Sequence, residues 1–446
     1  MNGLARNSPS PQPARGQSPI PLASPRGRGG KKGAVPPRRR NVCFVTGTRA
    51  EYGLMRNVLR AIADHPKLKL QLVATGMHLD PAHGDTLETI RDDGWTVDRV
   101  VPWPAGSGRD PATNARNTGI ATASLADAVC ELKSDVVLVV GDRVEAFAAA
   151  TAAHLSGIPV AHVHGGDRAA GQVDDALRHA ITKLAHVHFP ATRQSARRVR
   201  KLGEDAWRIH LAGSPGLDGI QSDAASRQDL AEALGELKPH RYALLLLHPA
   251  DANEAVGSRR ARLVLQAVGG VPYERIVIVY PNNDPGAAGI LRAWETAGRA
   301  RLLPSRGSLE SRGSAGASPS RLERHADNRL ILRRDVPRPV FLSLMRDAAV
   351  LVGNSSSGII EAASFGTPVV DIGPRQMGRE RWRNVVNVPY DAGRIRTELT
   401  RLWNRGKPRR FTSANIYGGR GTAAKIASVL AALTLDDRLI RKLIAY

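Results

Sequence analysis

The stretch Asn41-Val-Cys-Phe-Val-Thr46 is a short apolar run that ends in Gly47-Thr48-Arg49, the pattern of a buried strand leading into a turn. An amphipathic pattern follows from Glu51 to Asp64. Its apolar residues recur at helical spacing on one face, at Leu54, Val58, Leu59 and Ile62. A buried strand followed by an amphipathic helix is the repeating unit of a parallel α/β sheet. We therefore expect the ordered body of the chain to begin at residue 41 and to contain such a sheet.

The same unit recurs along the chain. In the first half, further apolar runs lie at residues 68–74, 136–140 and 158–163. After Gly213 the pattern starts again, with runs at 242–247, 275–280, 349–352 and 368–372. This alternation predicts two successive doubly wound α/β domains, at residues 41–213 and 214–420, followed by a helical segment at 421–446. The low aromatic content of 4%, within 42% hydrophobic residues, fits buried parallel strands built from Val, Leu, Ile and Ala.

Two segments of biased composition lie outside this pattern. Residues 1–40 are rich in Pro, Ser and Gly and contain nine Arg or Lys but no Asp or Glu. Residues 304–320 are of low complexity and contain Ser-Arg-Gly-Ser twice. Neither composition can bury enough apolar surface to offset the entropy of ordering. We expect a disordered, dispensable basic tail at 1–40, and at 304–320 a surface insertion in the second domain without chemistry.

The net charge of +23 is unevenly distributed. Nine of these charges belong to the tail, so the remainder of the chain carries +14. A globular body of that charge attracts phosphate-bearing substrates over long range. The aromatic side chains on which single-stranded nucleic acid stacks are sparse, so we do not expect nucleic acid as a main partner.

The two cysteines, Cys43 and Cys130, cannot form a disulfide framework, and both lie in apolar surroundings. We expect two buried thiols in a reducing compartment. No run approaches the roughly 20 apolar residues of a membrane helix, and the amino terminus lacks the apolar core of a signal peptide. The chain is therefore expected to be cytoplasmic, without a membrane partner.

Almost every predicted strand ends in glycine or in polar residues. In open parallel sheets, ligands bind beyond the carboxyl ends of the strands. The residues at these ends are Arg49, His78, Asp142, Arg143, His164, Asp167, His248, Asn282, Asp284 and the run from Ser355 to Gly358. Because both domains contribute, we expect the site in a cleft between two domains whose strand ends face each other.

The segment Gly353-Asn-Ser-Ser-Ser-Gly358, followed by Ile359-Ile360-Glu361, has the pattern of a strand, a turn and a helix start. Its backbone N–H groups and hydroxyls can bind a phosphate, and Glu361 can accept hydrogen bonds from two ribose hydroxyls. The alternative is a Ser-rich helix cap without a ligand. The sequence has neither a Gly-x-Gly-x-x-Gly fingerprint after the first strand nor a P-loop, so we expect no nicotinamide cofactor and no ATPase activity.

Candidate acid/base groups gather between residues 142 and 190. The histidines here are His162, His164, His179, His186 and His188. They lack Cys and Glu partners at ligand spacing, so we expect no metal site. The carboxylates Asp142, Asp167, Asp174 and Asp175 form the better set for proton transfer. For Asp174 and Asp175 the alternative is a helix N-terminus ahead of Ala176.

Taken together, these motifs resemble one known family, the hydrolysing UDP-N-acetylglucosamine 2-epimerases of the sialic acid and legionaminic acid type. The matching motifs of the first domain are Val45-Thr-Gly-Thr-Arg-Ala-Glu-Tyr-Gly53, Thr75-Gly-Met-His-Leu79, Gly141-Asp-Arg143, His162-Val-His-Gly-Gly-Asp167 and the run from Asp174 to His186. Those of the second are His248-Pro249, Pro281-Asn282, Gly353 to Gly358, Phe365-Gly-Thr-Pro368, Gly373 to Glu380 and Asn384-Val385. The resemblance covers residues 41 to about 430, without the tail and the insertion. It implies two Rossmann-like domains of the glycosyltransferase-B type, with UDP bound mainly by the second, and commonly a homo-oligomer.

The resemblance also implies a reaction. UDP is eliminated across C1 and C2 of the sugar, water adds to the glycal at C1, and C2 is reprotonated from the other face. The implied acid/base residues are Asp142, His164, Asp167 and Asp174. The implied substrate-binding residues are Arg49, His78, Arg143, Arg178, His248, Asn282, Ser355, Ser356, Ser357, Gly358, Glu361 and Arg379. No cofactor is implied.

Two positions depart from the family pattern. Sialic-acid-type members often have Glu in place of His164 and Glu in place of Asp167, so either residue is a candidate base. The departures leave two substrates open, UDP-N-acetylglucosamine and a UDP-2,4-diacetamido-trideoxyhexose. They also leave three other functions open: a non-hydrolysing epimerase, a glycosyltransferase of the same architecture, and a non-catalytic protein that binds a nucleotide sugar.

Overall fold

The computed structural model describes residues 38–79, 86–104, 111–168, 173–281, 286–299, 328–334, 336–418 and 420–445. Residues 1–37 of the predicted tail and the predicted insertion at 304–320 lie outside these residues. No helix in the described part of the chain combines the length and the apolarity that a membrane crossing requires.

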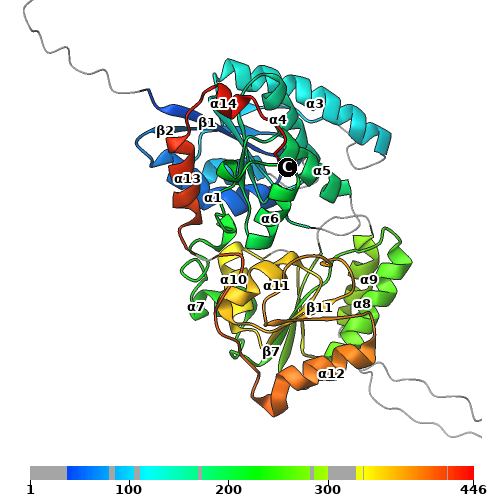
Figure 1. The fold of residues 1–446 in the computed structure, drawn as a ribbon. Coiled ribbons are helices and arrows are strands. Elements are labelled where there is room, and N and C mark those ends of the chain that lie inside the picture. The colour runs from blue at the N-terminus through cyan, green and yellow to red at the C-terminus, as the bar shows by residue number, and fades with distance from the viewer. Residues whose placement is uncertain are drawn as a thin grey trace, which may run out of the picture. The chain divides into compact units, whose positions relative to one another are not determined.

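The first sheet contains six parallel strands in the order β3-β2-β1-β4-β5-β6 (Figure 1). Its strands are β1 (Arg40–Thr46), β2 (Leu68–Ala74), β3 (Arg99–Val100), β4 (Val136–Val140), β5 (Val160–Val163) and β6 (Val187–Phe189). Its helices are α1 (Arg49–Ala63), α2 (Thr86–Asp92), α3 (Pro111–Glu131), α4 (Val144–Leu155), α5 (Val173–Leu184) and α6 (Arg193–Lys201). The 3₁₀ turns η1 (Gly76–Leu79), η3 (Ala206–Arg208) and η4 (Pro215–Leu217) lie between them.

The second sheet also has six parallel strands, in the order β12-β11-β10-β7-β8-β9. Its strands are β7 (Tyr242–Leu246), β8 (Arg275–Val279), β9 (Leu330–Arg333), β10 (Val350–Gly353), β11 (Val369–Ile372) and β12 (Val385–Val388). Its helices are α7 (Arg227–Leu234), α8 (Glu254–Gly269), α9 (Ala287–Arg299), α10 (Arg338–Asp347), α11 (Ser356–Ile360) and α12 (Ala392–Trp403), with η5 (Ala362–Phe365) and η6 (Asn404–Gly406).

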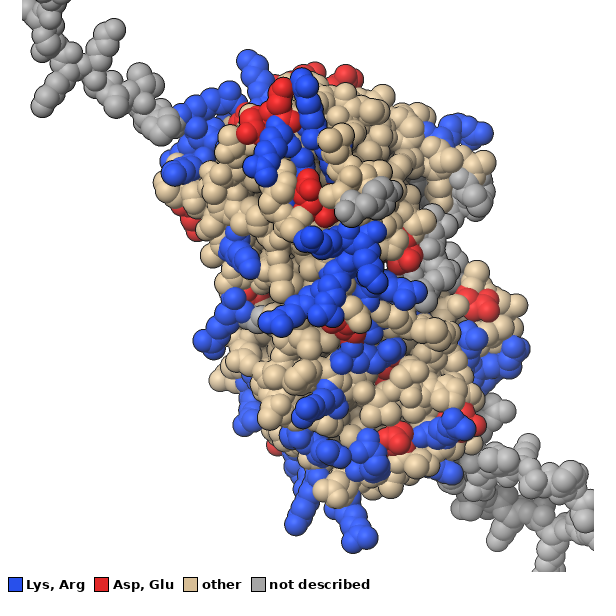
Figure 2. Space-filling model, in the orientation of Figure 1, with Lys and Arg blue, Asp and Glu red and all other residues tan. Residues whose placement is uncertain are grey.

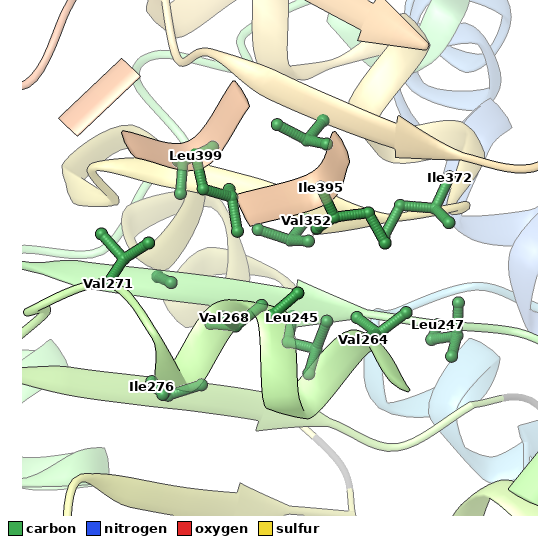
Figure 3. Close-up of a cluster of buried hydrophobic side chains, with 14 of the residues drawn as sticks. Leu245, Leu247, Val264, Val268, Val271, Ile276, Val352, Ile372, Ile395 and Leu399 are labelled. Atoms are coloured by element: carbon green, nitrogen blue, oxygen red, sulfur yellow. The ribbon is translucent and has the colours of Figure 1, made fainter. Parts of the chain in front are cut away.

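Buried strands and one-sided helices explain this architecture. All five residues of β4 are buried, as expected of a central strand covered by helices on both faces. In the second domain the core forms where α8 and α12 pack on the sheet. Figure 3 shows Val264 and Val268 of α8 near Leu245 of β7, and Ile395 of α12 near Val352 of β10. Aliphatic side chains fill this layer, in agreement with the low aromatic content.

The structure confirms the predicted central strands and the helix after β1. The strands absent from the prediction are β3, β6, β9 and β12, which are the outermost strands of the two sheets. The prediction for the cysteines was half wrong. Cys43 is buried in β1, but Cys130 is exposed because it lies on the outer face of α3.

The end of the chain returns to the first domain. Helices α13 (Thr422–Ala432) and α14 (Asp437–Ile440) lie beside α1 and β1 in Figure 1. Ile426 and Leu430 of α13 are fully buried in the same core as Val58 and Leu59 of α1. The predicted helical segment at 421–446 is therefore packed into the core of the first sheet.

Candidate functional site

The turn after β4 holds Asp142 beside a buried arginine. Gly141 has a φ of 80°, which lets the chain turn sharply where the strand ends. Arg178, from α5, forms an ion pair with the Asp142 carboxylate, and its Nη1 donates a hydrogen bond to the His164 carbonyl oxygen (3.3 Å). Only 4% of the Arg178 side chain is exposed, against 22% of the Asp142 side chain. The carboxylate is thus the accessible member of the pair.

Arg178 and the nearby Arg379 each have a guanidinium N–H group without a hydrogen-bond partner among the described residues. Burial lowers the pKa of Arg178 to about 9, and the nearby charge of Arg379 adds to this effect. Arg178 therefore stays charged at neutral pH. The Nε atoms of Arg178 and Arg379 are both buried and have no hydrogen-bond partner among the described residues. Arg56 Nε and Arg381 Nε are in the same condition elsewhere among the described residues, so an unpartnered Nε does not by itself mark a ligand site.

The end of β5 carries a buried imidazole that is fixed at both nitrogens. His164 has a φ of 65°, a left-handed conformation that is uncommon for a residue with a side chain. Its Nδ1 lies 2.8 Å from Asp167 Oδ2, and its Nε2 lies 3.1 Å from Ser214 Oγ. The other oxygen of Asp167 accepts a hydrogen bond from Ser195 Oγ (2.6 Å).

Asp167 is ionised despite its burial. Burial by itself raises the pKa of this carboxyl, but the hydrogen bond from His164 and the charge of Arg379 outweigh that effect and hold the pKa below its usual range. The order carboxylate, imidazole, hydroxyl is that of the serine hydrolases. Ser214 has no exposed surface, however, so its hydroxyl cannot attack a substrate from this position.

The other histidines of this region have structural partners. His162 Nε2 lies 2.8 Å from the Gly141 carbonyl oxygen, and His188 Nε2 lies 3.0 Å from the buried Glu204 Oε2. Burial lowers the pKa values of His162 and His186 to about 3 and that of His188 to about 4. The described residues bring no three His, Cys, Asp or Glu side chains together in a way that could hold a metal ion. These histidines are neutral parts of the packing.

Of the three arginines predicted to bind substrate from the first domain, Arg178 is buried and the other two are accessible. Arg49 is exposed at the start of α1. Arg143 has 44% of its side chain exposed, and its Nε donates to Glu145 Oε2 (3.2 Å). His78, in contrast, is buried, with its Nε2 3.0 Å from Thr46 Oγ1 and its Nδ1 2.9 Å from Thr86 Oγ1. Burial lowers the pKa of His78 to about 4, so it is a neutral bridge between two segments rather than a free cation.

Two buried carboxyl groups flank the turn that leads to Arg49. Glu51 Oε2 accepts a hydrogen bond from the Gly47 backbone N–H (2.9 Å), and its Oε1 is buried without a partner. The Glu145 side chain lies against the other side of Gly47, where a Cβ would be 2.6 Å from Glu145 Cγ. Burial, and then the charge of Glu145, raise the pKa of Glu51 from 4.5 to about 7.

In the second domain, the serine run follows β10 as predicted. Ser355 is the N-cap of α11, and its hydroxyl accepts a hydrogen bond from the Ser357 N–H (3.4 Å). Ser355 and Gly358 are buried, and Ser356 and Ser357 are partly exposed. The helix cap is therefore present, while phosphate binding by the two accessible hydroxyls stays a prediction.

Asn354 holds the backbone of His248 at two atoms. Its Oδ1 accepts from the His248 N–H (2.7 Å), and its Nδ2 donates to the His248 carbonyl oxygen (2.9 Å). Arg375 and Gln376 in turn donate to the Asn354 carbonyl oxygen, at 3.3 and 2.9 Å. Burial, and then the charge of Arg375, lower the pKa of His248 to about 4, so the ring is neutral.

The remaining predicted residues divide into two groups. Glu361 is mostly buried and forms an ion pair with Arg338 Nη1 (3.0 Å). Asn282 lies outside the described residues. Asp174 falls within α5, but its side chain also lies outside the described part of the structure.

The loop that carries Arg379 reaches residues of the first domain. Thr192 Oγ1 donates a hydrogen bond to Glu380 Oε1 (2.6 Å), and Tyr417 Oη donates to the Glu380 carbonyl oxygen (3.1 Å). Arg379 is close enough to Asp167 for its charge to lower the pKa of that carboxyl. The structure thus brings together the predicted residues Asp142, His164, Asp167, Arg178 and Arg379.

Comparison with known proteins decides the family. The sequence profile of the family described as UDP-N-acetylglucosamine 2-epimerase matches residues 60–431. The chain belongs to the UDP-N-acetylglucosamine 2-epimerase family. It is an enzyme of that family, and the predicted resemblance is confirmed at this level.

Individual members of the epimerase family are similar over most of the chain. The UDP-N,N'-diacetylbacillosamine 2-epimerase (hydrolyzing) of Legionella pneumophila is 33% identical over 91% of this chain and 100% of its own length. The UDP-N-acetylglucosamine 2-epimerase of Neisseria meningitidis is 29% identical over 86% of this chain and 92% of its own.

Solved epimerase structures share the fold. The UDP-GlcNAc 2-epimerase from Neisseria meningitidis, bound to UDP-GlcNAc, superposes with a TM-score of 0.70 at 19% identity, over 87% of this chain and 99% of that one. The enzyme from Methanocaldococcus jannaschii, in complex with UDP-GlcNAc and UDP, gives a TM-score of 0.66 at 15% identity, with the same coverage. The predicted fold, two Rossmann-like domains of the glycosyltransferase-B type, is confirmed.

Basic side chains are concentrated on one face of this epimerase. Figure 2 shows Lys and Arg side chains gathered across the middle of one face, at the level of α6 in Figure 1. Helix α6 has five basic residues among nine and no acidic residue. Arg198 of this helix donates to the Gly166 carbonyl oxygen (2.9 Å), next to Asp167. Such a field raises the local concentration of an anionic substrate.

Sequence reasoning missed five residues of this site. They are Thr192, Ser195, Ser214, Asn354 and Tyr417. Thr192 and Ser195 have the spacing of a helix cap, and Asn354 lies within the serine motif, so these three had a local signal. Ser214 and Tyr417 have none, because each reaches the site only through contacts with distant segments.

Proposed function

We propose that this epimerase is of the hydrolysing type. It converts UDP-N-acetylglucosamine, or a UDP-2,4-diacetamido-trideoxyhexose, to the free manno-configured sugar and UDP, with one water consumed. The observation that supports this most directly is the ion pair of the partly exposed Asp142 carboxylate with the buried Arg178, which is close enough to Arg379 for the two positive charges to interact. The site thereby combines guanidinium donors for the diphosphate oxygens, which gain negative charge, with a carboxylate that a sugar can approach.

The first step is elimination. A base removes the C2 proton, the C1–O bond to UDP breaks, and the electron pair of the C2–H bond forms the C1–C2 double bond. Asp142 and His164 are the candidates for this base, because each is held in place by other groups: Asp142 by Arg178, and His164 by Asp167 and Ser214. A weakly acidic C–H requires a base that is fixed beside it.

The second step is hydration of the glycal. The water oxygen bonds to C1, and a proton is delivered to C2 on the face opposite to the one it left. This inverts C2 and requires a second acid/base group across the ring. The candidates for this second group are Asp142, His164 and Asp174. Asp167 is not needed for this step, because both of its carboxylate oxygens already accept hydrogen bonds.

We propose that the second domain holds the UDP part. The partly exposed hydroxyls of Ser356 and Ser357 donate to phosphate oxygens, next to Gly358 and the neutral ring of His248. Arg49 and Arg379 neutralise the charge that the departing diphosphate gains. Glu361 accepts from the ribose hydroxyls, and its ion pair with Arg338 fixes the carboxylate for that role.

The hydrolysing type is supported by the similarity to the Legionella relative, a UDP-N,N'-diacetylbacillosamine 2-epimerase (hydrolyzing). The histidine at position 164 is a second reason to include the diacetamido sugar, since sialic-acid-type members often have glutamate there. We therefore propose both substrates and rank them by experiment.

The test is proton NMR in deuterated water, with each sugar nucleotide supplied separately to the purified enzyme. Free sugar with deuterium at C2, together with UDP, is the expected outcome, and the faster substrate is the preferred one. Recovery of an epimerised UDP-sugar would contradict hydrolysis and support the non-hydrolysing reaction. UDP binding without any turnover would contradict catalysis and support a protein that only binds the nucleotide sugar.

A further inference from the structure

The contacts of His164 determine where its proton lies. Asp167 is ionised and has no proton to donate, so the 2.8 Å contact with His164 requires the hydrogen to sit on Nδ1 of the imidazole. In the neutral ring, Nε2 then carries the lone pair. The hydroxyl of Ser214, at 3.1 Å, is placed to donate to it. Burial of all three residues excludes water as a competing partner.

Asp167 is itself held from a second side. Its Oδ1 accepts from the Ser195 hydroxyl at 2.6 Å, and Ser195 lies in the first turn of α6. With Oδ2 occupied by His164, neither oxygen is left to remove a proton from a sugar. This distinguishes Asp167 from Asp142, whose side chain is 22% exposed.

Ser214 belongs to one of two segments that run alongside each other. Its N–H donates to the Tyr417 carbonyl oxygen (2.7 Å). The preceding Gly213 lies against Gly418, and both have a positive φ, of 98° and 93°. Side chains would crowd this contact, since a Cβ on Gly213 would be 2.8 Å from Thr422 Oγ1 and a Cβ on Gly418 would be 3.2 Å from the Gly213 Cα. The position of the Ser214 hydroxyl is therefore set by tertiary structure and not by the first domain alone.

We propose that Asp167 is a positioning residue that holds His164 as its Nδ1–H tautomer, so that Nε2 is the atom that exchanges a proton with the sugar. Ser214 occupies Nε2 until substrate takes its place. This inference rests on the proposed function only in naming the sugar as the proton donor. The tautomer itself follows from the contacts. A hydroxyl that gives up one neutral hydrogen bond loses about 1 kcal/mol, which substrate binding can offset.

The first test is the tautomer, measured by two-bond ¹⁵N–¹H correlation on protein labelled at histidine nitrogen. The pH is set about two units above the ordinary histidine pKa, where neutral rings dominate. The His164 signals are assigned by their loss in His164→Gln. Nδ1–H is expected in the unaltered enzyme. An Nε2–H signal would overturn the proposal without any reference to activity.

Two variants separate the partners. In Asp167→Asn the amide N–H can donate to Nδ1, so the proton is expected to move to Nε2. The turnover number should then fall by a factor of about 10² to 10⁴, the range for loss of a positioned base, while UDP affinity is retained. Ser214→Ala is the matched control, in which Asp167 still fixes the Nδ1–H tautomer. An unchanged tautomer in Asp167→Asn, or a changed one in Ser214→Ala, would overturn the assignment.

Kinetics of Ser214→Ala test the second half of the proposal. If substrate has to displace the hydroxyl from Nε2, its loss raises kcat/KM by up to about fivefold, the equivalent of one neutral hydrogen bond. A fall of more than tenfold would show that the hydroxyl itself passes the proton on. If no sugar nucleotide is turned over while the tautomers behave as described, the proposed function fails and the positioning role of Asp167 stands.

Discussion

Arg178 places a positive charge where only 4% of its side chain is exposed, and the Asp142 carboxylate forms an ion pair with it. A buried charge depends on its partner, because removing one member of the pair leaves the other uncompensated. The same pair orients the carboxylate. A substitution at Asp142 is therefore expected to change both the turnover number and the stability of the first domain.

Asp142→Asn is expected to lower the turnover number by a factor of about 10² to 10⁴, since the amide cannot take up a proton. Affinity for UDP should change little, because the proposed UDP-binding residues are in the second domain. Initial rates and calorimetric titration of UDP measure the two effects. Asp437→Asn is the control, as its side chain is 80% exposed. Unchanged turnover in Asp142→Asn would remove Asp142 from the catalytic residues.

Glu51 gives the folded protein a dependence on pH. Its pKa is raised from 4.5 to about 7, mainly by burial, so between these values the folded state keeps a proton that the unfolded state has lost. Stability therefore falls as the pH rises from about 4.5 to about 7 and then stays level.

Glu51→Gln removes this dependence and should be more stable than the unaltered enzyme above pH 7, by on the order of 2–3 kcal/mol at most. The gap should close as the pH approaches 4.5. Thermal unfolding midpoints at pH 5 and pH 8 measure it. Glu88→Gln, at a side chain that is 47% exposed, should show the same gap at both values. A gap that does not grow with pH would contradict a protonated Glu51.

At the level of elements, the turn between β10 and α11 places the serine run. Gly353 has a φ of 137°, and a Cβ there would lie 1.8 Å from the Leu246 carbonyl oxygen of β7. The two strands pair through these residues. A side chain would force β10 away from β7 and shift Ser355 to Ser357 with it.

Gly353→Ala should cost more than about 3 kcal/mol of stability, because it combines backbone strain with a clash against the main chain. The loss is read from urea unfolding. Gly119→Ala is the matched control in the exposed face of α3, where a Cβ meets no atom within 4 Å. It should stabilise the protein by about 0.5–1 kcal/mol. Equal effects of the two changes would contradict this account of the turn.

At the level of the whole molecule, the chain ends in the domain where it began. Helix α13 covers α1, and the Arg40 guanidinium at the start of β1 donates hydrogen bonds to the carbonyl oxygens of Leu430 and Leu433. Asp218 accepts from the N–H groups of Thr422 and Ala423 and so caps the same helix. The first domain is complete only with these carboxyl-terminal residues.

Ile426→Ala should therefore destabilise the first domain, although residue 426 is far from it in sequence. The side chain is fully buried, and such truncations cost about 2–5 kcal/mol. Leu443→Ala, at a residue that is 80% exposed, should change stability by less than about 0.5 kcal/mol. Hydrogen exchange in β1 and α1 locates the effect. Loss of protection confined to the second domain would contradict it.

The central strands, the helix after β1 and the order of the two domains could be predicted from the sequence, because apolar periodicity and turn residues act between neighbours along the chain. The outermost strands β3, β6, β9 and β12 could not, since β6 has only three residues and the other three contain exposed or partly exposed residues, which interrupt the apolar run. The site followed the same division. Asp142, His164 and the serine run end strands and were predicted, whereas the contacts of Ser214 and Tyr417 had no local signal. The expected homo-oligomer stays a prediction.

What only the tertiary structure decided is which distant residues touch. His164 contacts Ser214, fifty residues away, Asp142 pairs with Arg178, and Ile426 enters the core around α1. Cys130 faces out although Ala128, Val129 and Leu132 near it in sequence are apolar. Local patterns fix each element and the direction of its faces. Which residues meet across those faces depends on how the helices and strands pack, and that packing involves the whole chain.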